Sequence, residues 1–283
     1  MDRRPGTAGP VSRFLMKSGA YVLLVIGGLS MLLPFVWMLV SSLQSRTQLY
    51  QIPPVWIPSP PRWANYGEVW VSINFARYFL NSCIVSTIVT VFAVLLSAMG
   101  GFSFAKYEFP GKKALFVYFI ATLMIPYQVT LIPLFLIFRH LGLLDTYLAL
   151  ILPGLTSAFG IFMMRQFISG IPEDLLDSAR IDGSREAGIF WRVILPNTKP
   201  ALSALAVFVF IGIWNDFIWP LVVISSDELK PIQVGLASFV QQHSASWHLV
   251  MAGATCALLP VIVVFLVFQR QFVAGVVFTG MKE

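Results

Sequence analysis

The segment Pro172–Pro200, PEDLLDSARIDGSREAGIFWRVILPNTKP, is the most polar stretch of the chain. Five acidic and five basic residues fall between Arg165 and Lys199, whereas only 11% of the 283 residues are charged. The whole chain is 57% hydrophobic, which is more than a soluble domain usually contains. We therefore expect a membrane protein in which this segment lies outside the lipid and contacts an aqueous partner.

Long, almost uncharged runs lie on both sides of this segment. A helix needs about 20 mostly apolar residues to cross the hydrocarbon core, and six runs suit that length, the fifth interrupted by Asp216. They predict an all-α, polytopic membrane protein with six transmembrane helices and one polar cytosolic loop over about residues 170–199. The predicted spans cover about residues 19–42, 78–105, 114–138, 146–166, 200–226 and 249–270.

The basic residues predict the orientation of the chain. With the N-terminus inside, the cytosolic segments carry fourteen lysines and arginines and the outer segments five, and cytosolic loops are normally the basic ones. We expect both termini in the cytosol, with residues 1–14 as a cytosolic tail and 15–283 as one transmembrane domain. The first apolar run is too long for a cleaved signal peptide, so we expect it to be retained. The excess of basic residues in the predicted cytosolic segments also explains the net charge of +6. The positive charge therefore gives no reason to expect nucleic acid as a partner.

Within the polar segment, the sequence predicts two helices separated by Gly183. Pro172 suits the first position of a helix, and the acids of the next turn favour the positive end of its dipole. Gly183 permits the turn that ends this helix, and Ser184 is expected to cap the second helix, which ends at Leu195 and Pro196. Because so short a helix is marginal in water, we expect packing to hold it. An ordinary amphipathic loop is the alternative interpretation.

The order of residues in this segment resembles the coupling-loop motif of ABC importer permeases, E-A-A, three residues, G, nine residues and I-x-L-P. The motif matches Asp177-Ser178-Ala179, Asp182-Gly183 and Val193-Ile194-Leu195-Pro196, where Asp177, Ser178 and Val193 replace the family residues. Other matches in the family order include Asn65-Tyr66, Asn81-Ser82, Pro126 with Gln128, and Trp214-Asn215-Asp216-Phe217. The sequence is therefore similar to permease subunits of binding-protein-dependent sugar ABC importers, the maltose-type (MalG-like) six-span family.

The resemblance implies a role and a set of partners. It implies a multi-pass subunit of a bacterial or archaeal cytoplasmic membrane that passes a sugar and works with a second, different permease, two ATP-binding subunits or domains, and an extracytoplasmic solute-binding protein. The chain lacks the G-x-x-x-x-G-K-[ST] phosphate-binding motif, so we expect no enzyme activity and no bound cofactor or metal, with ATP and Mg on the partner. The residues that the resemblance assigns to ATPase coupling are Asp177, Ser178, Ala179, Asp182, Gly183, Leu195 and Pro196.

Several polar and aromatic residues inside the predicted spans have the chemistry that binds sugars, namely flat rings, amides and acids. They are Asn81, Tyr127, Gln128, Trp214, Asn215 and Asp216, and we expect them along the substrate pathway. Asp216 is the most telling, because an acid in mid-span is costly and by default functional. The alternative for each of these residues is a role in packing between helices.

Two other classes of function compete with an importer subunit. A proton-coupled secondary transporter would use Asp216 as its relay, although such carriers usually need several intramembrane ionisable groups. An intramembrane hydrolase would use Ser103, which needs a base within hydrogen-bond reach. The three histidines are expected near the outer face and Ser103 near the inner face, so the bilayer separates them.

Overall fold

The computed structural model describes residues 10–72, 74–242 and 246–280, and this part of the chain contains helices and turns but no strand. The chain divides into two compact units, Met1–Val69 with His243–Thr255 and Trp70–Gln242 with Cys256–Glu283. The helices up to residue 140 are α1 (Pro10–Ser42), α2 (Arg46–Leu49), α3 (Ala64–Ser72), α4 (Phe75–Lys106), α5 (Lys112–Thr122) and α6 (Tyr127–His140). The predicted tail, residues 1–14, falls largely outside the described residues.

The later elements are shorter and more interrupted. They are α7 (Tyr147–Ile151), η1 (Leu152–Gly154), α8 (Ala158–Ser169), α9 (Glu173–Ile181), α10 (Glu186–Ile189), η2 (Phe190–Ile194), α11 (Leu195–Asn197), α12 (Lys199–Trp214), α13 (Ile218–Val223), η3 (Asp227–Leu229), α14 (Ile232–Gln242) and α15 (Trp247–Gly280). The segment η2 is a π-helix, and η1 and η3 are 3₁₀ turns.

Four segments of the described chain are helical, long and apolar enough to cross a membrane. They are Lys17–Ser42, Phe75–Lys106, Tyr147–Ser169 and Trp247–Gln269. Two further pairs of helices qualify only when taken together, α5 with α6 and the segment Glu186–Asn197 with α12. By length and composition the described residues therefore hold up to six spans, which confirms the predicted all-α, polytopic fold class.

Two predicted spans are not continuous helices. In the span predicted for residues 114–138, α5 and α6 meet at an angle of 99°, and Pro126, which has no N–H and restricts the residue before it, occupies the break. In the span predicted for 200–226, α12 ends at Trp214 and α13 starts at Ile218. The backbone N–H groups of Phe217, Ile218 and Trp219, at the start of α13, interact electrostatically with the Asp216 carboxylate. This interaction compensates in part for the helical bonds that the break removes.

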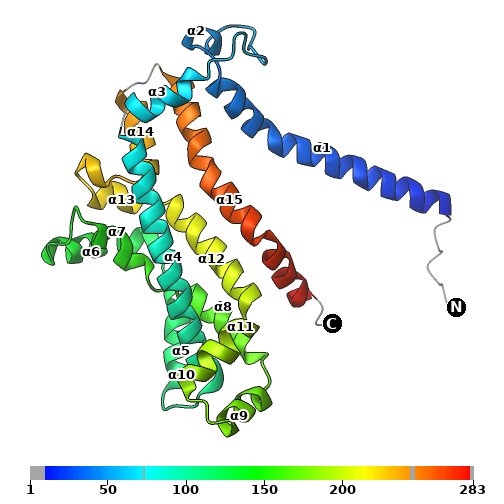
Figure 1. Cartoon of the computed structure of the whole chain (residues 1–283), viewed down its shortest axis with the longest axis vertical. Coiled ribbons are helices and arrows are strands. Elements are labelled where there is room, and N and C mark those ends of the chain that lie inside the picture. Colours follow the sequence, from blue (N-terminus) through cyan, green and yellow to red (C-terminus); the bar gives the residue numbers. More distant parts are fainter. Residues whose placement is uncertain (1–9, 73, 243–245, 281–283) are drawn as a thin grey trace. The chain divides into compact units, whose positions relative to one another are not determined.

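The core of the second unit is the packing of α4 against α8 and α12 (Figure 1). Gly101 of α4 faces the backbone of α8, where an added Cβ would meet Met164 Cβ at 2.6 Å and the Arg165 nitrogen at 2.8 Å. Gly160 of α8 faces Ser97 of α4 in the same way, with 2.3 Å to its Oγ. Small residues at both contact points let the two backbones approach closely, as is common between membrane helices.

The first unit is organised around a buried amide. Asn65 donates hydrogen bonds of 2.8 Å from Nδ2 to the carbonyl oxygens of Ser42 and Gln44. The adjacent Tyr66 hydroxyl lies 2.7 Å from Ser42 Oγ. The end of α1 is therefore fixed to the start of α3 by polar contacts, which gives the Asn65-Tyr66 pair of the sequence a structural role.

A substitution at the α4–α8 contact tests this packing. We expect Gly101→Ala to lower the melting temperature of the purified protein by several degrees, because overpacking a close contact costs about 1–3 kcal/mol. The matched control is Gly28→Ala in α1, where an added Cβ meets nothing within 4 Å. Melting curves in detergent measure both variants, and equal melting temperatures would contradict the close packing of the two backbones.

Candidate functional site

The polar segment forms a short helix, α9, that packs on the second unit at one end of the bundle (Figure 1). Leu176 is fully buried on its inner face, in a cluster that includes Ile168 of α8, Ile189 of α10 and Ile194 of η2. The opposite face is exposed, and Ile181 at its end is 86% exposed. Packing on one side thus holds a helix that is too short to be stable alone, and the other side is free to meet a partner.

Polar contacts anchor both ends of α9 to the end of α4. At the first end, Lys106 Nζ lies 2.9 Å from Glu173 Oε1, and the lysine side chain is only 3% exposed. At the other end, Arg180 makes ion pairs with Asp177 Oδ1 at 2.8 Å and with Glu186 Oε1 at 3.0 Å. The second carboxylate oxygen of Glu186 accepts a hydrogen bond from the Tyr107 hydroxyl. The helix is therefore held as a rigid element.

The charges of this cluster reinforce one another. The Tyr107 hydroxyl, followed by Arg180, lowers the pKa of Glu186, and burial together with Glu186 raises the pKa of Tyr107 to about 12. Hydrogen bonds to Glu186 and Asp177 raise the pKa of Arg180. Because the pKa of Glu186 is depressed in the folded state, its stabilising contribution is complete at neutral pH and is lost only as the pH falls below the ordinary carboxyl range.

The predicted coupling residues lie together on α9 and the turn that follows it. Gly183 ends the helix in the left-handed region with φ +80°, as its residue type predicts. Ser178 and Asp182 are exposed, whereas Ala179 is half-buried against the core. Leu195 and Pro196 lie apart from them in α11. Asp177, which the resemblance assigns to ATPase coupling, pairs with Arg180 of its own helix.

The second predicted helix differs from the expectation in two details. Its cap position is occupied by Arg185, which makes no side-chain capping bond, and not by Ser184. Its middle is a π-helix, Phe190–Ile194, which we did not expect from the local residue pattern. Phe190 and Ile194 are buried while Trp191 is 57% exposed. The wider π-turn therefore turns two large apolar side chains of this segment into the core.

A second candidate site lies at the helix breaks. Tyr127, which starts α6, and Asp216, which lies between α12 and α13, line the same cavity of about 290 Å³. The rest of its wall is Leu150, Pro153, Gly154, Gly212, Ile213 and Trp219. The cavity therefore joins a phenol hydroxyl, a carboxylate and an indole among small and apolar residues, which are groups that can bind a polyhydroxylated ligand.

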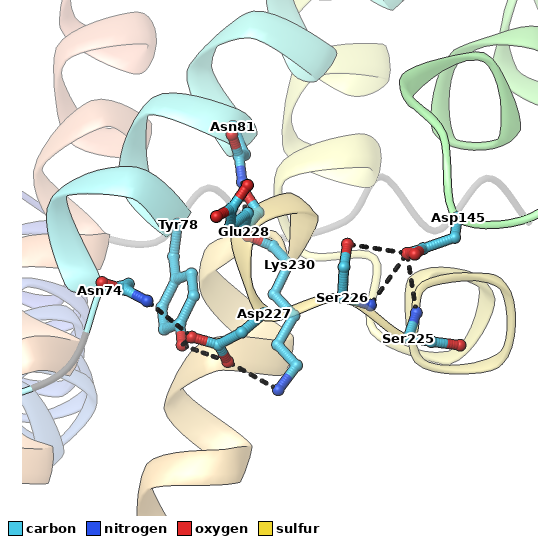
Figure 2. Close-up of polar contacts among 9 residues, drawn as sticks. All are labelled: Asn74, Tyr78, Asn81, Asp145, Ser225, Ser226, Asp227, Glu228 and Lys230. Atoms are coloured by element: carbon cyan, nitrogen blue, oxygen red, sulfur yellow. Dashed lines mark hydrogen bonds and ion pairs between the residues drawn. The ribbon is translucent and has the colours of Figure 1, made fainter.

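The other predicted pathway residues are placed differently. Asn81 lies in the polar network of Figure 2, where its Nδ2 donates to Glu228 O and Lys230 O at 2.8 and 3.0 Å. Trp214 is 1% exposed and donates from Nε1 to Ala257 O. Gln128 and Asn215 are exposed and do not line the cavity. Of the six predicted residues, the structure thus brings Tyr127 and Asp216 together, and Asn81 and Trp214 make packing contacts.

Sequence reasoning missed the glycines and the tryptophan that shape this cavity. An added Cβ on Gly154 would meet Val89 Cγ1 at 2.6 Å, so the glycine permits a close approach of η1 to α4. Trp219 is buried and donates from Nε1 to Ala149 O at 2.8 Å. Two features of the sequence could have pointed to these residues. One is the Pro153-Gly154 pair, and the other is that Trp219 follows Asp216 by only three positions.

These features define a helical membrane protein with a short polar helix packed at one end and a cavity at broken helices. Within the described residues, no group of histidines, cysteines and acids could hold a metal ion. Residues 93–277 match the family described as binding-protein-dependent transport system inner membrane component. The match covers more than half of the chain, and the chain belongs to this family.

Curated relatives agree with this assignment over nearly the full length. The arabinooligosaccharides transport system permease protein of Halalkalibacterium halodurans is 33% identical over 252 residues, which cover 88% of this chain and 90% of the relative. The sn-glycerol-3-phosphate transport system permease protein of Yersinia enterocolitica is also 33% identical and covers 91% and 94%. The diacetylchitobiose uptake system permease protein of Streptomyces coelicolor is 31% identical and covers 92% and 87%.

Solved structures agree as well. A chain of a bacterial ABC transporter involved in the import of the acidic polysaccharide alginate matches with a TM-score of 0.81 at 27% identity, over 95% of this chain and all of that chain. The protein is thus a membrane permease of a binding-protein-dependent ABC importer, and ATP is hydrolysed by separate subunits of such importers. The predicted family and the expectation of a permease without its own ATPase are confirmed.

The anchoring of α9 can be tested directly. We expect Arg180→Gln, which removes both ion pairs at its end, to make trypsin cleave after the exposed Arg185 about threefold faster, because local opening governs such cleavage. The control Lys112→Gln removes the Lys112–Glu108 pair, which lies outside α9, and should leave that rate unchanged. Mass spectrometry of timed digests measures both rates. An unchanged rate in Arg180→Gln would show that core packing alone holds the helix.

Proposed function

We propose that this chain is the permease subunit through which an ABC importer passes a sugar or related carbohydrate delivered by a solute-binding protein. The observation that carries the proposal is α9, a helix with one buried face, one exposed face and polar anchors at both ends. A rigid polar helix outside the membrane is suited to receive force from another protein. The carbohydrate names of two relatives, arabinooligosaccharides and diacetylchitobiose, support the substrate class.

The partner at α9 is the ATP-binding subunit. Its docking surface is the exposed side of the helix, where the apolar Leu175 and Ile181 lie beside Ser178 and Asp182. This chain pairs with a second permease to form a heterodimer. Two ATP-binding subunits or domains, which carry ATP and Mg, complete the transporter. Closure of the ATPases moves α9 and the corresponding helix of the second permease. This movement switches the permeases between inward-facing and outward-facing states, a rigid-body transition biased by ATP.

This assignment fixes the orientation that we propose for the chain. If α9 meets an ATPase, its end of α4 lies in the cytosol, and Asn74 at the other end of α4 lies outside. Both termini are then cytosolic, in agreement with the distribution of basic residues. The membrane is the cytoplasmic membrane of a bacterium or archaeon, and the solute-binding protein approaches from the opposite side.

The substrate pathway passes the cavity between Tyr127 and Asp216. A carboxylate and a phenol hydroxyl bind sugar hydroxyl groups, and the break between α12 and α13 exposes polar backbone groups that are tolerated only beside protein or water. The other four predicted pathway residues lie around this path: Asn81, Gln128, Trp214 and Asn215. They act by positioning helices or by contacting the substrate in other states of the transporter.

The coupling role of α9 is tested by Asp177→Ala and Gly183→Asp. We expect either substitution to lower ATP-driven uptake by about tenfold or more while the complex still assembles, since a few central residues dominate an interface. A Cβ added at Gly183 meets nothing within 4 Å, and its φ of +80° strains any other residue, so the effect of this substitution combines docking with backbone strain. Glu108→Ala, outside α9, is the control.

Uptake of radiolabelled sugar into proteoliposomes measures these variants. Normal uptake by both would overturn the proposed docking site. The same assay separates the rival function, because uptake that ignores ATP and stops with an uncoupler would identify a proton-coupled carrier that uses Asp216. The sugar itself is found by a ligand screen on the solute-binding protein that co-purifies with the permease.

The pathway is tested by substitutions in the cavity. We expect Asp216→Asn to lower the maximal uptake rate by about tenfold, because hydrogen bonds to a charged group contribute about 1.5–3 kcal/mol. The amide oxygen still accepts backbone N–H bonds, so the helix break and the assembly of the complex should persist. Tyr127→Phe should act in the same direction, and Tyr118→Phe, an exposed tyrosine of α5, is the matched control. Wild-type uptake in Asp216→Asn would assign this residue to packing alone.

A further inference from the structure

The cavity at the helix breaks has one charged group in its wall, and that group is an acid. Eight residues line the cavity, of which Asp216 carries a carboxylate and Tyr127 a phenol hydroxyl. The other six are two glycines, a proline, two aliphatic residues and Trp219. Neither lysine nor arginine is among these lining residues, so a single acidic side chain sets the electrostatic character of the wall.

The ion pairs of the described residues join other acids and do not include Asp216. Its carboxylate interacts with Tyr127 and with the backbone N–H groups of residues 217–219. Backbone N–H groups favour the charged form of a carboxylate and offset part of the cost of its burial, although they bring no net positive charge. The neighbouring Asn215 pairs with Gln233, a neutral amide. The field in the cavity is therefore negative.

Two aromatic rings lie in the same wall as the carboxylate. Tyr127 begins α6 and is exposed, and Trp219 lies in the first turn of α13. The indole donates a hydrogen bond from Nε1 to Ala149 O at 2.8 Å, so its polar atom is already used and the ring offers its π-system. The faces of tyrosine and tryptophan rings attract cations. The rings and the carboxylate thus favour the same sign of charge in a ligand.

The apolar part of the wall makes this charge more effective than a charge in bulk water. Leu150 and Ile213 line the cavity, and Val89 of α4 lies directly behind Gly154. These groups keep water from part of the site, and interactions between charges strengthen as the effective dielectric constant falls. An anion that entered would lose hydration without gaining a basic partner. Repulsion by the half-buried Asp216 would add to that cost.

We propose that Asp216 is a specificity-determining residue that selects the charge of the carbohydrate. The cavity accepts amino sugars in their ammonium form and neutral sugars, and it rejects sugars that carry a carboxylate or a phosphate. The inference rests on the function proposed above and names the substrate class of the same cavity. Membership of the family leaves this choice open, because similar proteins are named for sn-glycerol-3-phosphate and for the acidic polysaccharide alginate as well as for arabinooligosaccharides.

Three monosaccharides with the same ring separate charge from shape. At neutral pH glucosamine is cationic, glucose is neutral and glucuronate is anionic. Their binding to the complete complex in lipid nanodiscs, without ATP and without the solute-binding protein, is measured by saturation-transfer NMR. For the wild type we expect the dissociation constant of glucosamine to be about tenfold lower than that of glucuronate, with glucose between them, because charges at close range interact strongly in a partly dry site.

Substitutions in the wall separate charge from hydrogen bonding. Asp216→Asn removes the charge and should bring the three dissociation constants within about twofold of one another, because the source of the field is gone. Asp216→Glu keeps the charge and should keep the order. Tyr127→Phe removes a hydroxyl but neither the charge nor the ring, so it should weaken all three sugars alike. Glu108→Gln, the control, removes a negative charge from an exposed site outside the cavity and should change nothing.

The outcomes distinguish this inference from the proposed function. Equal affinities in the wild type, no saturable binding of any of the three sugars, or an order that persists in Asp216→Asn would each overturn the selection by charge. ATP-driven uptake by a protein without this order would leave the proposed function standing and reject the inference alone. Uptake that ignores ATP would reject the proposed function, whereas a charge order that vanishes in Asp216→Asn would still support the role of this residue.

Discussion

The close contact between α4 and α8 is the constraint on which the rest of the structure depends. Gly101 and Gly160 bring the two backbones together, and within lipid such packing replaces the hydrophobic effect as the main cause of helix association. Three residues separate the end of α8 from the start of α9. The position of α9 thus depends on two glycines in the bundle, and α9 is joined to α4 both through this backbone contact of α8 and through the side chains of Lys106 and Tyr107.

The two ends of α4 carry different polar networks because the helix is longer than the hydrocarbon core is thick. Tyr78 and Lys106 are separated by about 42 Å at 1.5 Å per residue, against about 30 Å of hydrocarbon. Lys106 pairs with Glu173 of α9 at one end, and the Tyr78 hydroxyl bonds to Asp227 of η3 at the other. Between them α4 presents mostly apolar and small residues, so these polar anchors lie toward the two ends of the helix.

The sequence predicted the fold class, the bounds of α9 and the turn at Gly183, because these depend on local composition and backbone geometry. It did not predict that α12 stops at Trp214, since an apolar run carries no periodicity that marks a break inside lipid. Asn81 and Trp214 have residue types that suit sugar binding, and yet their polar atoms bond within the chain. Such pairings join residues far apart in sequence, and local patterns do not determine them. Tyr127 and Asp216 line the same cavity because each lies at a break between two helices, α5 and α6 for Tyr127 and α12 and α13 for Asp216.

The cavity also bears on the source of energy. Among the residues that line it, Tyr127 and Asp216 are the only two ionisable ones, and the carboxylate interacts electrostatically with the backbone N–H groups of the next three residues. A proton pathway needs a series of groups that exchange protons, whereas here the acid closes a helix break. The neighbouring Asn215 accepts a hydrogen bond from Gln233 of α14 at 3.3 Å, which links this break to α14. In the function proposed above, the intramembrane charge therefore shapes the helix break, and the work of transport enters from outside the lipid through α9.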